Sequence, residues 1–226
     1  KADFKGGIVY IRARQLTVRS GGKIHADGGD STRSKYNVDP DRNFGGFVGP
    51  TNANDPGASY CNALNAIGNS GSNNCNGGGG GFCMNGNTSQ DCAGSCESGN
   101  RYSAPSGGGN KTMGEAGEYG DSLPGDVWGN ELDGLLKMGG GGGDWAGGEG
   151  GGAGGGIVVI GADVIFVQGG GSISANGGYG AWYNGANCTY SGGAGGAGGT
   201  VALFTRILTN EGSIEAIGGV GGNNDL

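Results

Sequence analysis

The stretch "GIVVIGADVIFVQGGGSISANGG" (156–178) decides the fold, because the chain contains two further versions of it. It aligns without a gap with "GIVYIRARQLTVRSGGKIHADGG" (7–29), and apolar and glycine residues match position by position. A third copy, "GTVALFTRILTNEGSIEAIGG" (199–219), aligns when a gap of about two residues is opened in its middle. Matches at fixed positions indicate a repeat architecture in which successive copies stack on one another.

Each copy has the same internal order. β-Forming residues fill 157–160 after a glycine pair, then 164–167 after a short polar step, and then 172–175 before another glycine pair. Strands this short cannot bury a core alone, but stacked copies can. We therefore predict an all-β fold, a β-helix or solenoid built from short-strand coils. Its predicted core consists of Ile8, Ile11, Val18, Ile24, Ile157, Ile160, Val167, Ile173, Leu203 and Ile214.

Glycine tracts lie outside the strands, at 77–81, 139–143, 146–156 and 192–199. The last of them, "GGAGGAGG", has a period of three, which is the period of the polyproline II conformation. Bare glycine backbones in that conformation can hydrogen-bond side by side, because no Cβ keeps them apart. The sequence therefore predicts polyglycine II-like packing, and alanine at every third position predicts a face with room for a methyl group. The alternative is a flexible linker.

The chain divides into three parts that together form one continuous structural unit. Residues 1–30 hold the first copy, and 139–226 hold the glycine tracts and the two further copies. Between them, 31–138 is an insertion rich in Cys, Asn and Gly, which we expect to form disulfide-stapled loops.

Composition narrows the classes of protein. Glycine accounts for 61 of the 226 residues, so folding costs much backbone entropy and buries few side chains in return. The formal net charge of −7 weighs against a nucleic-acid partner, which requires a basic surface. No apolar run approaches the length that would insert in a membrane.

The six cysteines are even in number, form no Cys-x-x-Cys pair and accompany a single histidine, so disulfides are a better explanation than zinc. Disulfides imply an oxidising compartment. Their connectivity stays open. The cysteines are Cys61, Cys75, Cys83, Cys92, Cys96 and Cys188.

Three glycosylation sequons begin at Asn87, Asn110 and Asn187. Chance sequons are common in an Asn-rich chain, but together with the cysteines they favour a secreted glycoprotein at the cell surface or beyond it.

The segments "LDGLLKMGGGGG", "GGGAGGGIVVIGADVIFVQGGGSISANGGYG" and "GGAGGAGGTVALFTRILTNEGSIEAIGGVGG" resemble the glycine-rich repeat regions of large secreted or cell-surface proteins. The resemblance covers 115–222 and 6–30 and leaves out the cysteine-rich part of the insertion. The glycine tracts are also similar to the polyglycine II bundles of phage adhesins and springtail antifreeze proteins. The resemblance implies an architecture and no catalytic role.

Candidate sites for chemistry are few. His25 alternates with Ile24 and Ala26 and is expected to point outward. We therefore expect no enzyme and no cofactor. Calcium is the most plausible ion, because hard oxygen ligands on glycine-rich loops suit it, although the spacing matches no known calcium loop and the residues also suit solvated turns. The weak candidates are Asp39, Asp41, Asp144 and Glu149.

These features predict an extracellular structural protein whose copies associate into a surface filament, stalk or matrix layer. The alternative is an adhesin, or a glycan- or ice-binding module, on a glycine-rich scaffold. An exposed aromatic row would bind glycans or a neighbouring copy, whereas the simpler explanation is that these side chains cover bare glycine backbone. The row consists of Trp145, Tyr179, Trp182, Tyr183 and Tyr190.

Overall fold

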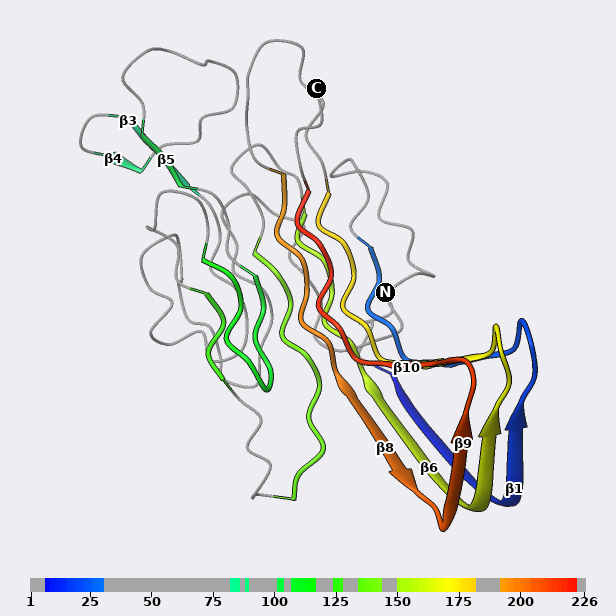
Figure 1. Ribbon diagram of the computed structural model, residues 1–226. Coiled ribbons are helices and arrows are strands. Elements are labelled where there is room, and N and C mark those ends of the chain that lie inside the picture. The colour runs from blue at the N-terminus through cyan, green and yellow to red at the C-terminus, as the bar shows by residue number, and fades with distance from the viewer. Residues whose placement is uncertain are drawn as a thin grey trace, which may run out of the picture.

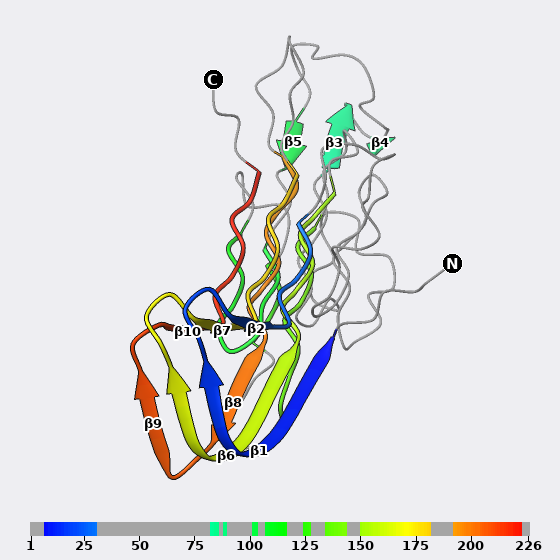
Figure 2. The same cartoon turned by 90° about the vertical axis from the view of Figure 1, so that its right-hand side faces the viewer.

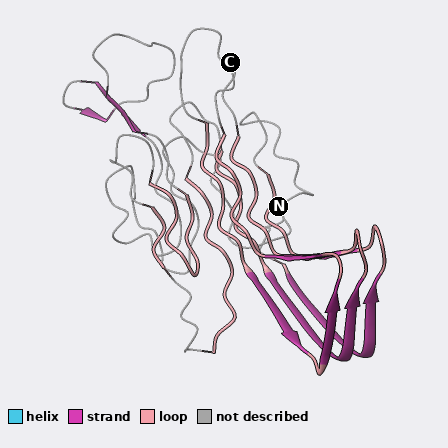
Figure 3. Cartoon of the chain, in the orientation of Figure 1, coloured by secondary structure: helices cyan, strands magenta, loops and turns pink. Residues whose placement is uncertain are grey.

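The structure, a computed structural model, consists of strands and extended segments (Figure 3). None of the residues that it describes forms a helix, and hence none forms one long and apolar enough to cross a membrane. The predicted all-β class is confirmed. The described residues are 7–30, 82–85, 88–89, 101–103, 107–116, 124–127, 134–143, 150–181 and 192–222.

Three copies of the repeat lie side by side in parallel. The first contains β1 (Ile8–Val18) and β2 (Lys23–His25), and the second contains β6 (Ile157–Val167) and β7 (Ser172–Ser174). The third contains β8 (Thr200–Phe204), β9 (Ile207–Asn210) and β10 (Ser213–Glu215). The second copy lies in the middle, because β6 pairs with β1 on one side and with β8 and β9 on the other, and β7 lies between β2 and β10. The strands of each copy follow three sides of a triangle (Figures 1 and 2).

The strand register reproduces the sequence alignment. Ile8 lies opposite Ile157, and Ile24 lies opposite Ile173, so the first two copies pair without a shift. Between the second and third copies the offset changes after Val167, which still lies opposite Asn210. The missing two residues therefore fall in the turn that precedes β7 and β10.

The first two predicted strands of a copy are joined in β1 and β6. β6 runs from Ile157 to Val167 and pairs on both sides of the step at Gly161–Asp163. The predicted break is therefore wrong for these two copies, because a strand can bend at a corner while its ladder continues. The third copy keeps the break, with Thr205 and Arg206 between β8 and β9.

A glycine in the left-handed region turns the chain before β2 and again before β7. Gly21 has φ 75° and Gly170 has φ 81°. The amide of the next residue closes each turn, since Gly22 N donates to Arg19 O and Gly171 N donates to Gln168 O, both at 2.8 Å. A positive φ at the third turn position is the requirement of a type II turn, which glycine meets without strain.

The core lies between the strands and is centred on the second copy. The largest fully buried side chains all belong to that copy and are Val158, Ile160, Ile165, Val167 and Ile173. Val18 is also buried in the core, and Ile11, Ile24, Leu203 and Ile214 pack against it with partial exposure. Alternation along the strand places the neighbour of each inward residue on the other face. The core assignment of Ile8 is therefore wrong, because Val9 points inward and Ile8 is 63% exposed. Ile157 is buried but lies outside the core cluster.

The glycine-rich segments continue from the ends of the copies and hydrogen-bond to one another through their backbones. On most of their glycines an added Cβ would overlap a backbone atom of a neighbouring segment. Residues 107–116 belong to this arrangement, because Gly108 N donates to Gly195 O and Gly140 N donates to Gly109 O. The glycine packing thus includes part of the predicted insertion.

A separate antiparallel sheet lies within the insertion. Its strands are β3 (Phe82–Asn85), β4 (Thr88–Ser89) and β5 (Arg101–Ser103), with β3 in the centre.

Candidate functional site

Most residues that the sequence singled out for chemistry fall outside the described part of the chain. Among the cysteines, the acidic calcium candidates, Asn87 and Asn187, only Cys83 has a described backbone, on β3. Within the described residues, no group of three or more His, Cys, Asp or Glu side chains could hold a metal ion. The disulfides, the glycans on two sequons and the calcium site stay predictions. The residues concerned are Cys61, Cys75, Cys83, Cys92, Cys96, Cys188, Asn87, Asn187, Asp39, Asp41, Asp144 and Glu149.

The third sequon residue, Asn110, links two segments of the fold. Its half-buried side chain donates from Nδ2 to Gly198 O at 2.8 Å and to Gly199 O at 3.1 Å. An N-linked glycan is attached through the same nitrogen, so glycosylation would displace one of these hydrogen bonds. In the folded chain Asn110 therefore joins residues 107–116 to the segment that leads into β8.

Polar side chains form a ladder across the three copies. Asp27 accepts hydrogen bonds from Ser174 Oγ at 3.0 Å and from Asn176 N at 2.8 Å. Asn176 occupies the equivalent position one copy further on, and its Oδ1 accepts from Ile217 N at 3.0 Å. Each side-chain oxygen thus binds the backbone amide of the next copy. The ladder ends at Ile217, because isoleucine offers no acceptor.

Removal of the Asp27 carboxylate is expected to destabilise the fold. Asp27→Ala leaves the amide of Asn176 and the hydroxyl of Ser174, which is 8% exposed, without their acceptor. We expect a loss of about 1–3 kcal/mol in the free energy of unfolding. Asp27→Asn keeps an oxygen in the place where Asn176 has one, and it should recover most of the loss. Urea denaturation measures both variants, and equal losses would contradict the ladder.

His25 lies on the exposed side of β2, as predicted. Its Nδ1 lies 3.5 Å from Asp27 Oδ2, and the two side chains are 48% and 36% exposed. The hydroxyl of Ser174 donates to that carboxylate and not to the imidazole. Nucleophilic catalysis by serine needs the hydroxyl to donate to a base such as the imidazole. Because Ser174 donates to Asp27 instead, the three side chains have the geometry of a structural contact between copies.

The outer copies have free edges. Among the described residues, the strands of the first and third copies pair only with those of the second. As a result, most inward side chains of the outer copies stay partly exposed, with Val18 and Ala26 as the buried exceptions. Leu208 is 46% exposed, whereas Ile165, at the same position of the middle copy, is completely buried.

The free edge of the third copy continues a regular series of backbone donors. Ala26 N donates to Ser174 O, and Ala175 N, at the equivalent position, donates to Glu215 O, both at 2.9 Å. Ala216 is next in the series, and its amide has no partner in the described part of the chain. The same one-residue stagger would match this amide to the carbonyl of His25 on another first copy.

Charges differ between the two free edges. The first copy exposes Arg12, Arg14, Arg19 and Lys23, whereas the third carries Glu211 and Glu215 besides Arg206. In the register of the copies, Arg19 and Glu211 follow the equivalent residues Val18 and Asn210. Arg19 and Glu211 therefore place opposite charges at matching positions of the two ends, whereas Arg206 matches Arg14.

A hollow of about 890 Å³ lies on the outer face at the corner of the strands. Tyr10 and Phe204 line it and are 66% and 64% exposed. Arg206 also lines it, with Nε 3.7 Å from Asp163 Oδ1. Exposed rings and guanidinium groups suit carbohydrate and anionic ligands. Sequence reasoning did not single out this surface, although alternation along the strand would have placed Tyr10 outward.

Comparisons of the chain with protein-family models, with characterised proteins and with solved structures find no match.

Proposed function

We propose that this chain is a non-catalytic extracellular structural protein whose copies associate into a filament, stalk or matrix layer. The observation that carries the proposal is the pair of free edges, one at each end of the stack, that share the register of the internal strand pairs.

The proposal includes a finer description of the fold. Three parallel copies in register support a segment of β-solenoid. Hydrogen bonds that recur every third residue along 192–199 support polyglycine II-like packing of the glycine segments.

Assembly follows from the two edges being different from each other. The first copy of one molecule would stack on the third copy of the next, which is a head-to-tail contact. Such contacts do not close on themselves unless a rotation forms a ring, so they produce filaments. Unpaired strand edges favour this addition, and the half-exposed inner side chains of the outer copies would become buried.

The extracellular location is supported by the sequence alone. Six cysteines and three sequons suit a secreted protein with disulfides and glycans. We propose that the protein works without a metal or other cofactor. If an ion is bound, calcium is the one that the acidic loops would suit.

A second candidate is an adhesin or glycan-binding module. The corner hollow supports it, because Tyr10, Phe204 and Arg206 line it and expose ring and guanidinium groups. Ice binding has less support, since it needs a flat, regular array of Thr or Ala, which the strands lack.

The assembly prediction uses the charges at the two ends. Sedimentation velocity and electron microscopy of the purified chain should show open-ended polymers that grow with concentration. Glu211→Lys would set two cations against each other at the junction, and it should raise the concentration needed for assembly roughly two- to fivefold at low salt. The double variant Arg19→Glu with Glu211→Lys reverses both charges and should restore assembly.

A chain that stays monomeric at high concentration would overturn the filament proposal. If that monomer bound glycans on an array, and Tyr10→Ala and Phe204→Ala abolished the binding, the second candidate would replace it.

A further inference from the structure

Residues 192–199 lie at the centre of the glycine-rich bundle. Hydrogen bonds connect them to five neighbouring segments, all of them described parts of this chain. A rod packed among equal parallel rods has six neighbours, so one position beside 192–199 is filled by none of the described segments. The five neighbours are 107–110, 139–143, 150–156, 175–181 and 216–222.

The hydrogen bonds of 192–199 repeat every third residue. Amides 193, 196 and 199 donate to 175–181, and amides 194 and 197 donate to 139–143. The carbonyls also fall into three sets, which accept from 216–222, from 150–156 and from 107–110. Three donor directions thus alternate with three acceptor directions around the segment. Five of the six directions are each occupied by one neighbouring segment.

The third donor set is that of residues 192, 195 and 198. Gly192 N donates to Gly222 O at 3.2 Å, and no described segment lies opposite the donors of Gly195 and Gly198. Both residues are buried, yet their amides have no hydrogen-bond partner in the described part of the chain. A buried amide without a partner costs free energy. Since the other directions are occupied, these two amides face the gap between 107–110 and 216–222.

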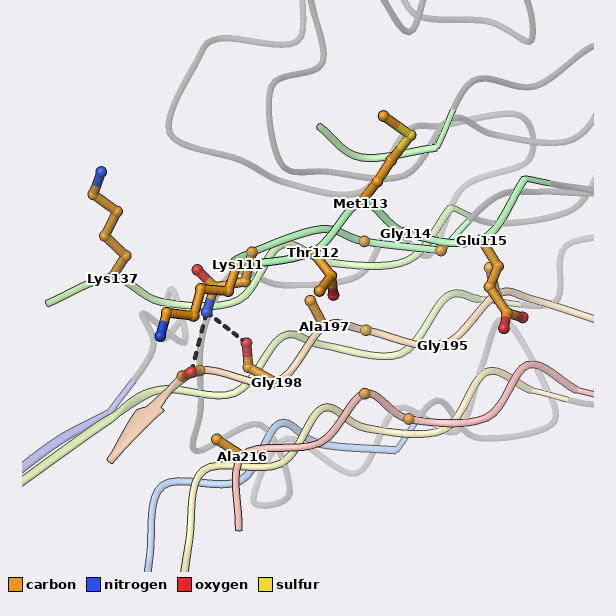
Figure 4. A pocket seen from close by; sticks show the side chains of 18 of the residues that line it. Lys111, Thr112, Met113, Gly114, Glu115, Lys137, Gly195, Ala197, Gly198 and Ala216 are labelled. Atoms are coloured by element: carbon orange, nitrogen blue, oxygen red, sulfur yellow. Dashed lines mark hydrogen bonds between the residues drawn. The ribbon is translucent and has the colours of Figure 1, made fainter. Parts of the chain in front are cut away.

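A groove occupies that gap. Its volume is about 1180 Å³, and its lining comes from 107–116, 134–137, 192–202 and 216–222. Figure 4 shows Thr112 and Glu115 on one side, Ala216 on the other, and Gly195 and Gly198 between them. The groove therefore lies at the sixth position of the bundle.

The fold already fills two equivalent positions. Segment 150–156 leads into β6 and bonds to both 26–30 and 175–181. Segment 192–199 leads into β8 and bonds to both 175–181 and 216–222. The groove is the next position in this series, on the outer side of 216–222. What fits it is a segment of the same kind.

We propose that the groove binds an extended glycine-rich segment of a second copy of this chain, which accepts hydrogen bonds from Gly195 and Gly198. The inference rests on the proposed self-association and names a surface for it. Another molecule of this chain is the expected occupant, because this chain itself supplies the segments that fill the two equivalent positions.

Two glycines of the groove allow a test without damage to the fold. A Cβ on Gly218 would lie 3.6 Å from its nearest neighbour, Gly196 O, and one on Gly221 would lie 3.7 Å from Gly193 O. Both are ordinary contacts, and both residues line the groove. A Cβ at either position therefore fits the isolated chain, and a larger side chain adds volume to the lining of the groove.

The experiment measures peptide binding and self-association separately. The probe is a fluorescent peptide with the sequence of residues 192–199 and a lysine tag, and the readout is fluorescence anisotropy. Gly218→Val and, independently, Gly221→Val should weaken its binding at least tenfold. Gly161→Val is the matched control, because a Cβ there meets nothing within 4 Å and the site lies outside the groove. A peptide with valine at the second and fifth positions should not bind.

The outcomes separate the two proposals. The groove inference predicts that both groove variants, with unchanged thermal stability, also raise the concentration needed for assembly. Peptide binding that is absent in the natural chain, or equal in Gly218→Val, overturns the groove. Assembly that persists unchanged in both variants also overturns it but leaves the stacking of free edges intact. If the chain binds the peptide but never assembles, the proposed function is overturned. Another molecule of this chain is then also excluded as the occupant of the groove.

Discussion

Gly195→Val is expected to unfold the glycine-rich bundle. A Cβ at Gly195 would overlap the carbonyl group of Gly219 and press against the backbone of Val220. Both belong to the neighbouring segment, so relief requires that segments move apart and lose hydrogen bonds such as Gly219 N to Gly196 O. We expect a loss of at least about 3 kcal/mol in the free energy of unfolding, the upper part of the range for overpacked sites.

Chemical denaturation followed by circular dichroism measures this loss. Gly161→Val serves as the control, because a Cβ there meets nothing within 4 Å and valine favours strands. The control should keep the stability of the natural chain. If Gly195→Val were as stable as Gly161→Val, the segments around 192–199 would not be closely packed.

Ile173→Ala is expected to have the second large effect. Ile173 is completely buried in the middle copy, between Ile24 of the first copy and Ile214 of the third. Truncation leaves a cavity that two neighbouring copies surround, and substitutions of this kind cost about 2–5 kcal/mol.

The same substitution at the equivalent positions tests the layout of the stack. Ile24 and Ile214 are only partly buried, so Ile24→Ala and Ile214→Ala should each cost about half as much as Ile173→Ala. Thermal or urea unfolding ranks the three variants. Equal losses at the three positions would contradict a stack with the second copy in the middle.

Much of the fold could be predicted because the repeats carry positional information. The gap-free match of 7–29 with 156–178 is the strand register itself, with Ile8 opposite Ile157. The alternation of inward and outward residues also predicts that Ile8 and Ile11 lie on opposite faces of the strand, so the two could not both belong to the core. The break expected at Gly161 was wrong because local sequence does not distinguish a bent strand from two strands.

The candidate surfaces were less predictable. Asp27 and Asn176 occupy matching positions, but only the stacked copies show that each binds the backbone of the next one. The sequon at Asn110 predicts a glycan, and it does not predict the hydrogen bonds of Asn110 to Gly198 and Gly199. These contacts join residues far apart along the chain, and nothing in the local pattern specifies such a pair.

The sequence by itself determined the strand class, the register of the three copies and the three-residue period of 192–199. These properties depend on the spacing of residues along the chain. In stacked strands, and in segments with a three-residue repeat, that spacing sets which backbone groups form hydrogen bonds. The tertiary structure alone decided which glycine segments become neighbours, because glycine has no side chain by which one segment could be distinguished from another as a packing partner. It also decided that described segments fill five positions around 192–199 and that a groove lies at the sixth. The course of the whole chain through the bundle sets that arrangement, and the groove beside Gly195 and Gly198 is its result.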